Sequence, residues 1–452
     1  MSVSVYGPSA KRAERSASLG VDPQHRRAVI VLSDVHLAPT FDSDRLPFRS
    51  ACFSPAAYLS QTIDRAVEHA RKTGCGLEIV LAGDVFDFDV PQSAEEARTG
   101  LRLADTTTPE VAAYALHRML YDHLPFTLAL QRAAQAGGRV VVLPGNHDAQ
   151  LGFVRVRKTL ERVIGSNERP VYGRGAAASE ALVFAPWYYA AADGAVHIEH
   201  GHLYDPLCTV ARLCLESRGN TERTIGTVSS FYAPLLLPGV DPFVVDPFAE
   251  RRSFRETTAS LFAGFAGSAV HGTLVGPDTT SLLACMRELF AATSQSRCTS
   301  DEANVLAFEL GIEPAEVDYL RGFFAAKATA SEVLAICTGG VDYAGSVEER
   351  TRRAMTAATV LHGASVAVVG HTHRPGASLL PNGSTLLNSG AWTPRRTASE
   401  PVGSYAWITA HEGRIDEASV RHVYRNEHPV YGRGEAASEA RVSSAGVPRV
   451  RR

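Results

Sequence analysis

Five short groups of aspartate, asparagine and histidine residues offer oxygen and imidazole nitrogen donors of the kind that bind divalent metal ions. Each group comes at or just after the end of a run of apolar residues. In chain order they are Asp34-Val35-His36, Gly83-Asp84-Val85-Phe86-Asp87, Gly145-Asn146-His147-Asp148, His200-Gly201-His202 and Gly370-His371-Thr372-His373. The groups contain no cysteine, and nitrogen and oxygen ligands accept Mn, Fe and Zn alike.

The spacing within these groups suits a metal site. In an extended segment residues i and i+2 point to the same side, so Asp34 and His36 can present two ligands toward one point. The same spacing relates His371 and His373. A single group of this kind is weak evidence, because GNHD could be an ordinary turn and GHTH a surface loop. Five such groups together predict a metal centre.

The segments before the groups indicate how they are positioned. Apolar strands are expected at 28–33, 77–82 and 139–143, alternating with helices near 56–72 and 109–136. Shorter strands are expected at 181–185, 195–199, 365–369, 384–388 and 404–409. The longer strands lack polar alternation, which indicates sheets buried on both faces with helices outside, an α/β fold. Such sheets carry their sites at the carboxyl ends of strands, where the five groups fall.

The series DVH, GDVFD, GNHD, HGH and GHTH resembles the signature of the calcineurin-like metallophosphoesterase superfamily. The likeness covers about 28–205 and 350–415. It implies a four-layer α/β/β/α sandwich and a dinuclear metal centre. The helical insert between the fourth and fifth groups would then form a cap on this sandwich.

The resemblance also implies a ligand set. One ion would be held by Asp34, His36, Asp84 and His373, and the other by Asp84, Asn146, His200 and His371. Asp84 would bridge the ions, and His202 remains the alternative ligand within HGH. Two ions about 3.5–4 Å apart can lower the pKa of a shared water and neutralise a phosphoryl group in an in-line displacement. The prediction is hydrolysis of a phosphoester or pyrophosphate by a metal-bridging hydroxide.

Three further residues are expected to take part in catalysis. The resemblance implies that His147 contacts phosphate and protonates the leaving oxygen, oriented by a carboxylate, and Asp148 follows it directly. Asp87 is expected to be the partner of a ligand histidine. Arg374 and the Arg395-Arg396 pair are candidate phosphate contacts, because guanidinium binds phosphate through two hydrogen bonds, although a solvated role suits each equally.

Composition narrows the partners. The chain of 452 residues has 45 Lys+Arg against 48 Asp+Glu, so no general nucleic-acid binding is expected. Its seven cysteines include no CxxC pair, and its N-terminus lacks the apolar run of a secretory signal, so a cytoplasmic location is expected. The expected organisation is a flexible arm at 1–26, a catalytic domain at 27–205 and 346–425, a helical cap at 206–345, and a tail at 426–452.

The cap and the tail raise questions of substrate and partner. The cap contains two stretches nearly free of charge, 227–245 and 257–277, which favour an apolar pocket or contact with a membrane surface over a spanning helix. Segments 278–293, 300–310 and 313–327 are expected to be helical. The tail repeats 167–181 at 426–440 with two differences and reads as a surface duplication, the alternative being a segment that competes for the same docking place.

The substrate stays open among several hypotheses. The chain resembles bacterial UDP-2,3-diacylglucosamine pyrophosphatases in the placement of the cap and in the sequence motifs SDVHL and GDVFDF. This resemblance implies a lipid-like substrate and peripheral membrane contact. The larger insert, HGH in place of HGD, and the extended termini depart from that pattern. A soluble nucleotide phosphodiesterase or a protein phosphatase is the alternative enzyme. A non-catalytic metal-bound scaffold is the alternative of another class.

Overall fold

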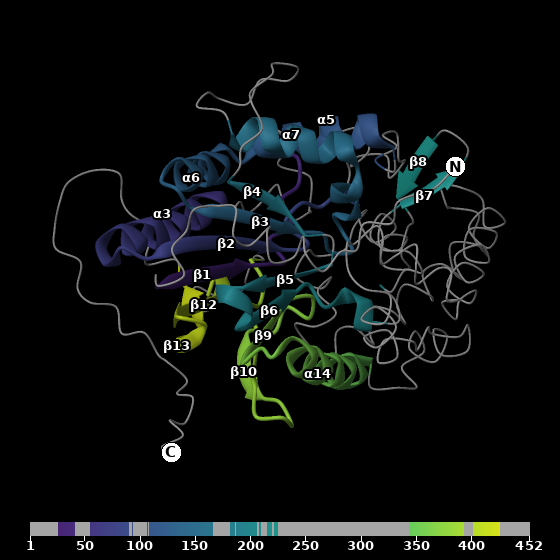
Figure 1. Ribbon diagram of the computed structural model, residues 1–452. Helices are drawn as coiled ribbons and strands as arrows, with labels where there is room; N and C mark the ends of the chain where they lie inside the picture. Colours follow the sequence, from purple (N-terminus) through teal and green to yellow (C-terminus); the bar gives the residue numbers. More distant parts are fainter. Residues whose placement is uncertain are drawn as a thin grey trace, which may run out of the picture.

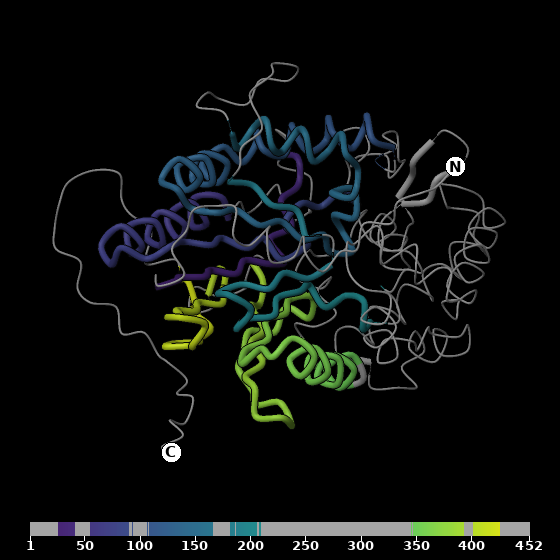
Figure 2. Tube along the Cα trace, in the orientation of Figure 1, coloured from purple at the N-terminus to yellow at the C-terminus, as the bar shows by residue number. Residues whose placement is uncertain are grey.

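The computed structural model describes residues 26–40, 55–89, 93, 106, 108–165, 181–185, 187–205, 208, 215–218, 221–224, 343–392 and 401–424. Figures 1 and 2 show the chain in one orientation, with colours that follow the sequence. Nearly all of the expected arm and cap, the expected tail, and both repeat copies apart from Ala181 lie outside the described residues.

A six-stranded sheet forms one half of the fold, in the order β13-β12-β1-β2-β3-β4. Its strands are β1 (Arg27–Leu32), β2 (Gly76–Ala82), β3 (Arg139–Leu143), β4 (Leu182–Phe184), β12 (Gly403–His411) and β13 (Arg414–Val423). Strands β1 to β4 run parallel, and β12 and β13 extend the sheet in antiparallel pairs beyond β1. The carboxyl ends of β1, β2 and β3 therefore lie along one edge.

A five-stranded sheet forms the other half, in the order β10-β11-β9-β6-β5. Its strands are β5 (Tyr188–Ala191), β6 (Val196–Glu199), β9 (Val366–Val369), β10 (Gly376–Leu379) and β11 (Thr385–Asn388). Strands β6, β9 and β11 are parallel, while β5 and β10 pair antiparallel at the two edges. The ends of β6 and β9 again lie side by side.

The two sheets pack face to face because β1 alternates its side chains between two apolar clusters. Val29 and Val31 belong to the buried cluster that includes Val366 of β9, between the sheets. Ile30 and Leu32 belong to the cluster that includes the helices on the outer face. Strand β1 is thus buried on both faces, as its unbroken apolar run predicted.

Helices cover both outer faces (Figure 1). On the first sheet lie α3 (Ala56–Thr73), α5 (Pro109–Asp122), α6 (Leu124–Gln135) and α7 (Val154–Ile164). On the second lies α14 (Tyr343–His362), whose Ala354, Met355 and Ala358 share a buried cluster with Val369 of β9. The α/β class with two sheets between helices is confirmed.

One expected helix is wrong in its extent. The segment 109–136 was expected to be continuous, but α5 ends at Asp122 and α6 begins at Leu124. Pro125 explains the break, because proline has no N–H to donate and its ring collides with the carbonyl one turn earlier. In the first turn of a new helix proline is tolerated. His123 stands between the helices and bonds through Nε2 to Ala38 O at 2.7 Å.

Little of the insert is described. Its described part contains an antiparallel hairpin of β7 (Leu215–Arg218) and β8 (Thr221–Thr224) and the first residues of α14. The expected helices at 278–293, 300–310 and 313–327 and the apolar stretches 227–245 and 257–277 lie outside the described residues. No helix in the described part of the chain is long and apolar enough to cross a membrane.

Candidate metal centre

The five predicted donor groups meet where the two sheets end. Asp34, Asp84 and Asn146 follow the neighbouring parallel strands β1, β2 and β3. His200 and His371 follow β6 and β9, which are neighbours in the second sheet. Backbone hydrogen bonds join the loops within each sheet, from Asp34 N to Gly83 O at 3.1 Å and from Gly370 N to His200 O at 2.9 Å.

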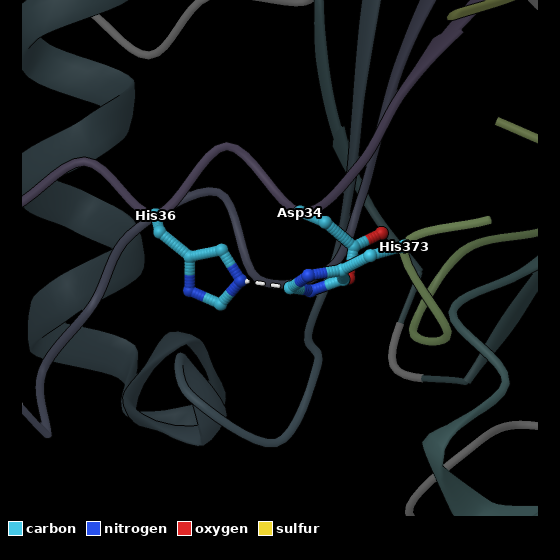
Figure 3. Close-up of side chains that lie close together, drawn as sticks. All are labelled: Asp34, His36 and His373. Atoms are coloured by element: carbon cyan, nitrogen blue, oxygen red, sulfur yellow. Dashed lines mark hydrogen bonds and ion pairs between the residues drawn. The ribbon is translucent and has the colours of Figure 1, made fainter. Parts of the chain in front are cut away.

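Asp34, His36 and His373 form the first cluster, each offering one donor atom within 4.8 Å of the others. All three are buried. Figure 3 shows the His36 ring facing His373, and the two Nε2 atoms lie 3.2 Å apart. His373 Nε2 also lies 3.2 Å from Asp34 Oδ1. Facing imidazole lone pairs beside a carboxylate suit a cation between them.

Asp84, His200 and His371 form the second cluster, also with one donor atom each within 4.8 Å. His200 Nε2 lies 3.1 Å from Asp84 Oδ2, while its Nδ1 lies 2.9 Å from Ala82 O. Because a carbonyl only accepts, Nδ1–H must donate to it, which leaves Nε2 of the neutral ring as the acceptor. That is the atom a metal ion would take.

The two clusters adjoin each other. The backbone N–H of His371, from the second cluster, donates to both carboxylate oxygens of Asp34, at 3.1 and 3.0 Å. The Ser33 hydroxyl donates to Asp34 as well. Asp34 is therefore held between the sheets, next to both groups of donors.

The backbone of the predicted ligands is strained. Among the described residues, eight non-glycine positions have a positive φ, and five of these are predicted ligands. These five are Asp34 (φ 52), His36 (φ 52), Asp84 (φ 52), His371 (φ 66) and His373 (φ 55). Each such residue costs about 1–3 kcal/mol, and strain of this kind gathers at functional sites. The fold thus maintains an unfavourable backbone to turn these side chains toward one another.

Two glycines leave room for the carboxylates. A Cβ on Gly370 would overlap the Ser33 hydroxyl and the Asp34 carboxylate, and one on Gly145 would overlap the Asp84 carboxylate. The loops at the ends of β3 and β9 therefore press their backbone directly against the donors at the ends of β2 and β1.

We predict that Gly145→Ala weakens metal binding while the fold persists. The added methyl group would lie 2.6 Å from the Asp84 backbone nitrogen as well as on its carboxylate, so Asp84 must move. Relief of such overpacking costs about 1–3 kcal/mol. The measurement is bound Mn²⁺ per chain. Gly376→Ala, where a Cβ meets nothing within 4 Å, is the control and should bind like the wild type. Unchanged binding in Gly145→Ala would contradict the prediction.

The site strongly favours positive charge. Burial opposes ionisation of Asp84, but His200 and His147 outweigh it and hold the pKa of that carboxyl well below its usual range. Burial likewise raises the pKa of Asp34, but His200 and His373 outweigh it, so the pKa is lowered. Burial lowers the pKa of His200, yet Asp84 and Asp34 raise it to about 9. Buried carboxylates that draw protons onto their neighbours in this way suit divalent cations.

His147 lies at the edge of both clusters. Its side chain is 16% exposed, and its backbone N–H donates to Asp84 Oδ1 at 2.7 Å. Nδ1 pairs with Asp89 Oδ2 at 3.0 Å and lies 3.7 Å from Asp87 Oδ1. Burial lowers the pKa of His147, but Asp84 first and the other carboxylates after it raise the pKa to about 10. A protonated imidazole held in this way can donate from Nε2.

Asp87 and Asp89 each orient a different histidine, His36 and His147 respectively. Asp87 Oδ2 lies 3.3 Å from His36 Nδ1, so it orients a predicted ligand. Asp89, which is closest to His147, was not among the predicted residues. Its position two residues after Asp87 in the acidic run GDVFDFD was the available sequence signal.

Asp148 fixes the backbone around Asp84. Its carboxylate accepts N–H bonds from Gly145 (2.6 Å), Asp84 (3.2 Å), Val85 (2.9 Å) and Phe86 (3.3 Å). Burial and the charge of Asp84 raise the pKa of Asp148 to about 7. These bonds position the loops after β2 and β3, including the loop that carries Asn146, which is buried.

The other described candidates, His202 and Arg374, belong to neither cluster. His202 is buried with its ring centroid 5.3 Å from that of His200, and it belongs to neither cluster of three. Burial, and after it His200 and His371, lower its pKa well below the usual range. Arg374 pairs with Glu348 of α14 through a short ion pair. Arg395 and Arg396 lie outside the described residues.

The two buried clusters of Asp and His lie where the two sheets of this α/β protein end, and their donor atoms are consistent with a metal site. Residues 28–245 match the family model of the calcineurin-like phosphoesterases, so this part of the chain is similar to that family. The matched range contains the first four donor groups. The fifth, with His371 and His373, lies beyond it and is brought to the others by the second sheet.

Other comparisons add little. No curated protein matches this chain. One solved structure that does match is a conserved uncharacterized protein of Streptococcus pneumoniae TIGR4, described as a predicted phosphoesterase. The identity is 12%, the alignment covers 90% of this chain and 93% of that one, and the TM-score is 0.25. At this TM-score the likeness supports no conclusion about the fold.

Proposed function

We propose that this protein hydrolyses a phosphoester or pyrophosphate bond with the help of two divalent metal ions. The observation that carries the proposal is the pair of adjoining buried clusters, Asp34/His36/His373 and Asp84/His200/His371. The donors are imidazole nitrogens and carboxylate oxygens, which suit Mn, Fe or Zn. Asp84 as the bridge and Asn146 as a further ligand complete the proposed set.

The bound ions would lower the pKa of a water molecule and neutralise charge on the phosphoryl group. The residues of the chain do the rest. Asp34 and Asp84 orient the site through their backbone contacts to His371 and His147. His147, held by Asp89, donates a proton to the leaving oxygen, and burial of the clusters limits access of bulk water. Asp148 takes part as the support of Asp84.

The substrate class is proposed from the sequence. The nearly uncharged stretches 227–245 and 257–277 fall in the insert, and we propose that they select a lipid-like phosphoester or pyrophosphate and touch a membrane surface. The competing hypotheses are a soluble nucleotide phosphodiesterase or protein phosphatase, and a metal-bound scaffold without turnover.

Metal removal tests the proposed function. We expect a chelator to abolish hydrolysis and Mn²⁺ to restore it together with two bound ions per chain. The panel should contain a monoester, a diester, a soluble pyrophosphate and a lipid pyrophosphate, each assayed with the full chain. Two bound ions without turnover of any substrate would favour the scaffold, and hydrolysis that survives chelation would contradict a metal-dependent mechanism.

A further inference from the structure

One buried carboxylate beside the candidate metal centre is absent from the predicted ligand set. Asp205 is fully buried, and its Oδ2 lies 2.8 Å from Nε2 of His371. Because His371 belongs to the cluster with Asp84 and His200, Asp205 touches a proposed ligand from outside that cluster.

The backbone fixes Asp205 in this position. It follows the short 3-10 helix η3 (His202–Tyr204), and its N–H donates to His202 O at 3.1 Å. Cys208 N–H donates in turn to Asp205 O at 3.0 Å. The Tyr204 hydroxyl donates to Glu199 Oε2 at 2.6 Å, which ties the turn back to the end of β6. The carboxylate therefore belongs to a well-anchored turn.

This contact bears on which nitrogen of His371 is left to bind a cation. A neutral imidazole carries one proton, and a carboxylate accepts it, so the proton stays on Nε2 and the lone pair on Nδ1. The backbone N–H of His371 is meanwhile held by Asp34. A carboxylate on the far nitrogen also makes the ligating nitrogen more basic.

We propose that Asp205 is a positioning residue that holds His371 with Nδ1 toward the second metal ion. The inference rests on the proposed function, since it concerns one ion of that site. A rival arrangement exists, because Asp205, Cys208 and His371 each offer a donor atom within 4.8 Å of the others. In that rival, Asp205 is itself a ligand and Nε2 of His371 binds the ion.

Mn²⁺ titration of the metal-free full chain tests the proposal. In the wild type we expect two binding steps. Asp205→Ala should weaken one step by about 10–100-fold, the usual effect of losing such a partner, and leave the other unchanged. Asp205→Asn should lose less, because its amide oxygen still accepts from Nε2–H. The isosteric Asn variant keeps the test available should the Ala variant fail to fold.

Two controls separate positioning from other roles. Glu78→Gln changes another buried carboxylate, near the start of β2 at the opposite end of the first sheet, and should leave both steps unchanged. Cys208→Ser should also bind like the wild type, whereas a loss equal to that of Asp205→Ala would support the rival site and overturn the proposal.

The tautomer of His371 gives a readout independent of turnover. In ¹⁵N-histidine spectra of the metal-free chain, the signal absent from a His371→Asn variant should show Nε2–H, and this preference should weaken in Asp205→Ala. Nδ1–H in the wild type, or two unaltered Mn²⁺ steps in both Asp205 variants, would overturn this inference alone. Fewer than two Mn²⁺ steps in the wild type would overturn the proposed function together with it.

Discussion

Asp84→Asn is expected to reduce turnover by about 10³-fold or more, because metal ions contribute several kcal/mol of transition-state stabilisation and about 1.4 kcal/mol corresponds to tenfold in rate. Asp84 is the proposed bridge, and its Oδ2 already lies 3.1 Å from His200 Nε2. The amide keeps the shape and can still accept the His147 N–H, but it loses the charge that both ions need. Occupancy of both positions should fall.

Metal analysis of purified Asp84→Asn decides this assignment. Asp34→Asn is the informative comparison, because it should affect chiefly the ion beside His36 and His373. Asp193→Asn is the inert control: its side chain pairs with Arg27 at 3.9 Å, at the far end of β1 from the site. Two ions retained in Asp84→Asn would show that Asp84 does not bridge.

The sequence predicted the candidate metal donors because the ends of buried strands can be recognised from it. Unbroken apolar runs indicate strands buried on both faces, and polar residues directly after them must lie at the sheet edge. Asp34 and Asp84 follow from this rule alone, since β1 and β2 are adjacent and parallel. The meeting of His371 with Asp34 required more, because nothing local indicates that β9 belongs to a second sheet packed on the first.

The carboxylates that contact the histidines of the site were not predicted, and the reason is physical. Asp89 contacts His147 and Asp205 contacts His371, and both histidines are distant in sequence. These pairings depend on the paths of the loops and not on the two-residue period of a strand. Asp148 was expected to take part in catalysis, and its carboxylate accepts hydrogen bonds from four backbone amides. Sequence motifs identify the candidate metal ligands. The residues that hydrogen-bond to those ligands are determined by how the loops pack.

The strained backbone of the predicted ligands is confined to single residues within the motifs. The extended segment expected at Asp34 and His36 is wrong, because both residues have a left-handed φ of 52°, which no helix or strand propensity describes. Hydrogen bonds hold this geometry, from Val35 N and His36 N to Asp84 O, both at 2.9 Å. The backbone conformation at Asp34 and His36 therefore depends on the contact between two loops, which is visible only in the folded structure.

His147→Gln should lower kcat by about 10²–10⁴-fold, the usual contribution of a positioned general acid, while both metal ions stay bound. His147 is held from two sides, by Asp89 at Nδ1 and by Asp84 at its backbone N–H. Glutamine keeps the backbone contact and can still form hydrogen bonds, but it cannot transfer a proton. The loss should therefore depend on the leaving group.

Two substrates with the same phosphoryl group make that dependence measurable. An alkyl ester needs a proton on its leaving oxygen, so His147→Gln should slow it by the full factor, whereas a p-nitrophenyl ester departs as a stable anion and should be slowed far less. His411→Gln serves as the control, because His411 ends β12 beside the start of β1, at the opposite end of the sheet. An equal loss for both esters with metal content intact would mean that His147 binds or supports the site without donating a proton. Rescue of the alkyl ester alone by added imidazole would identify the missing group as the acid itself.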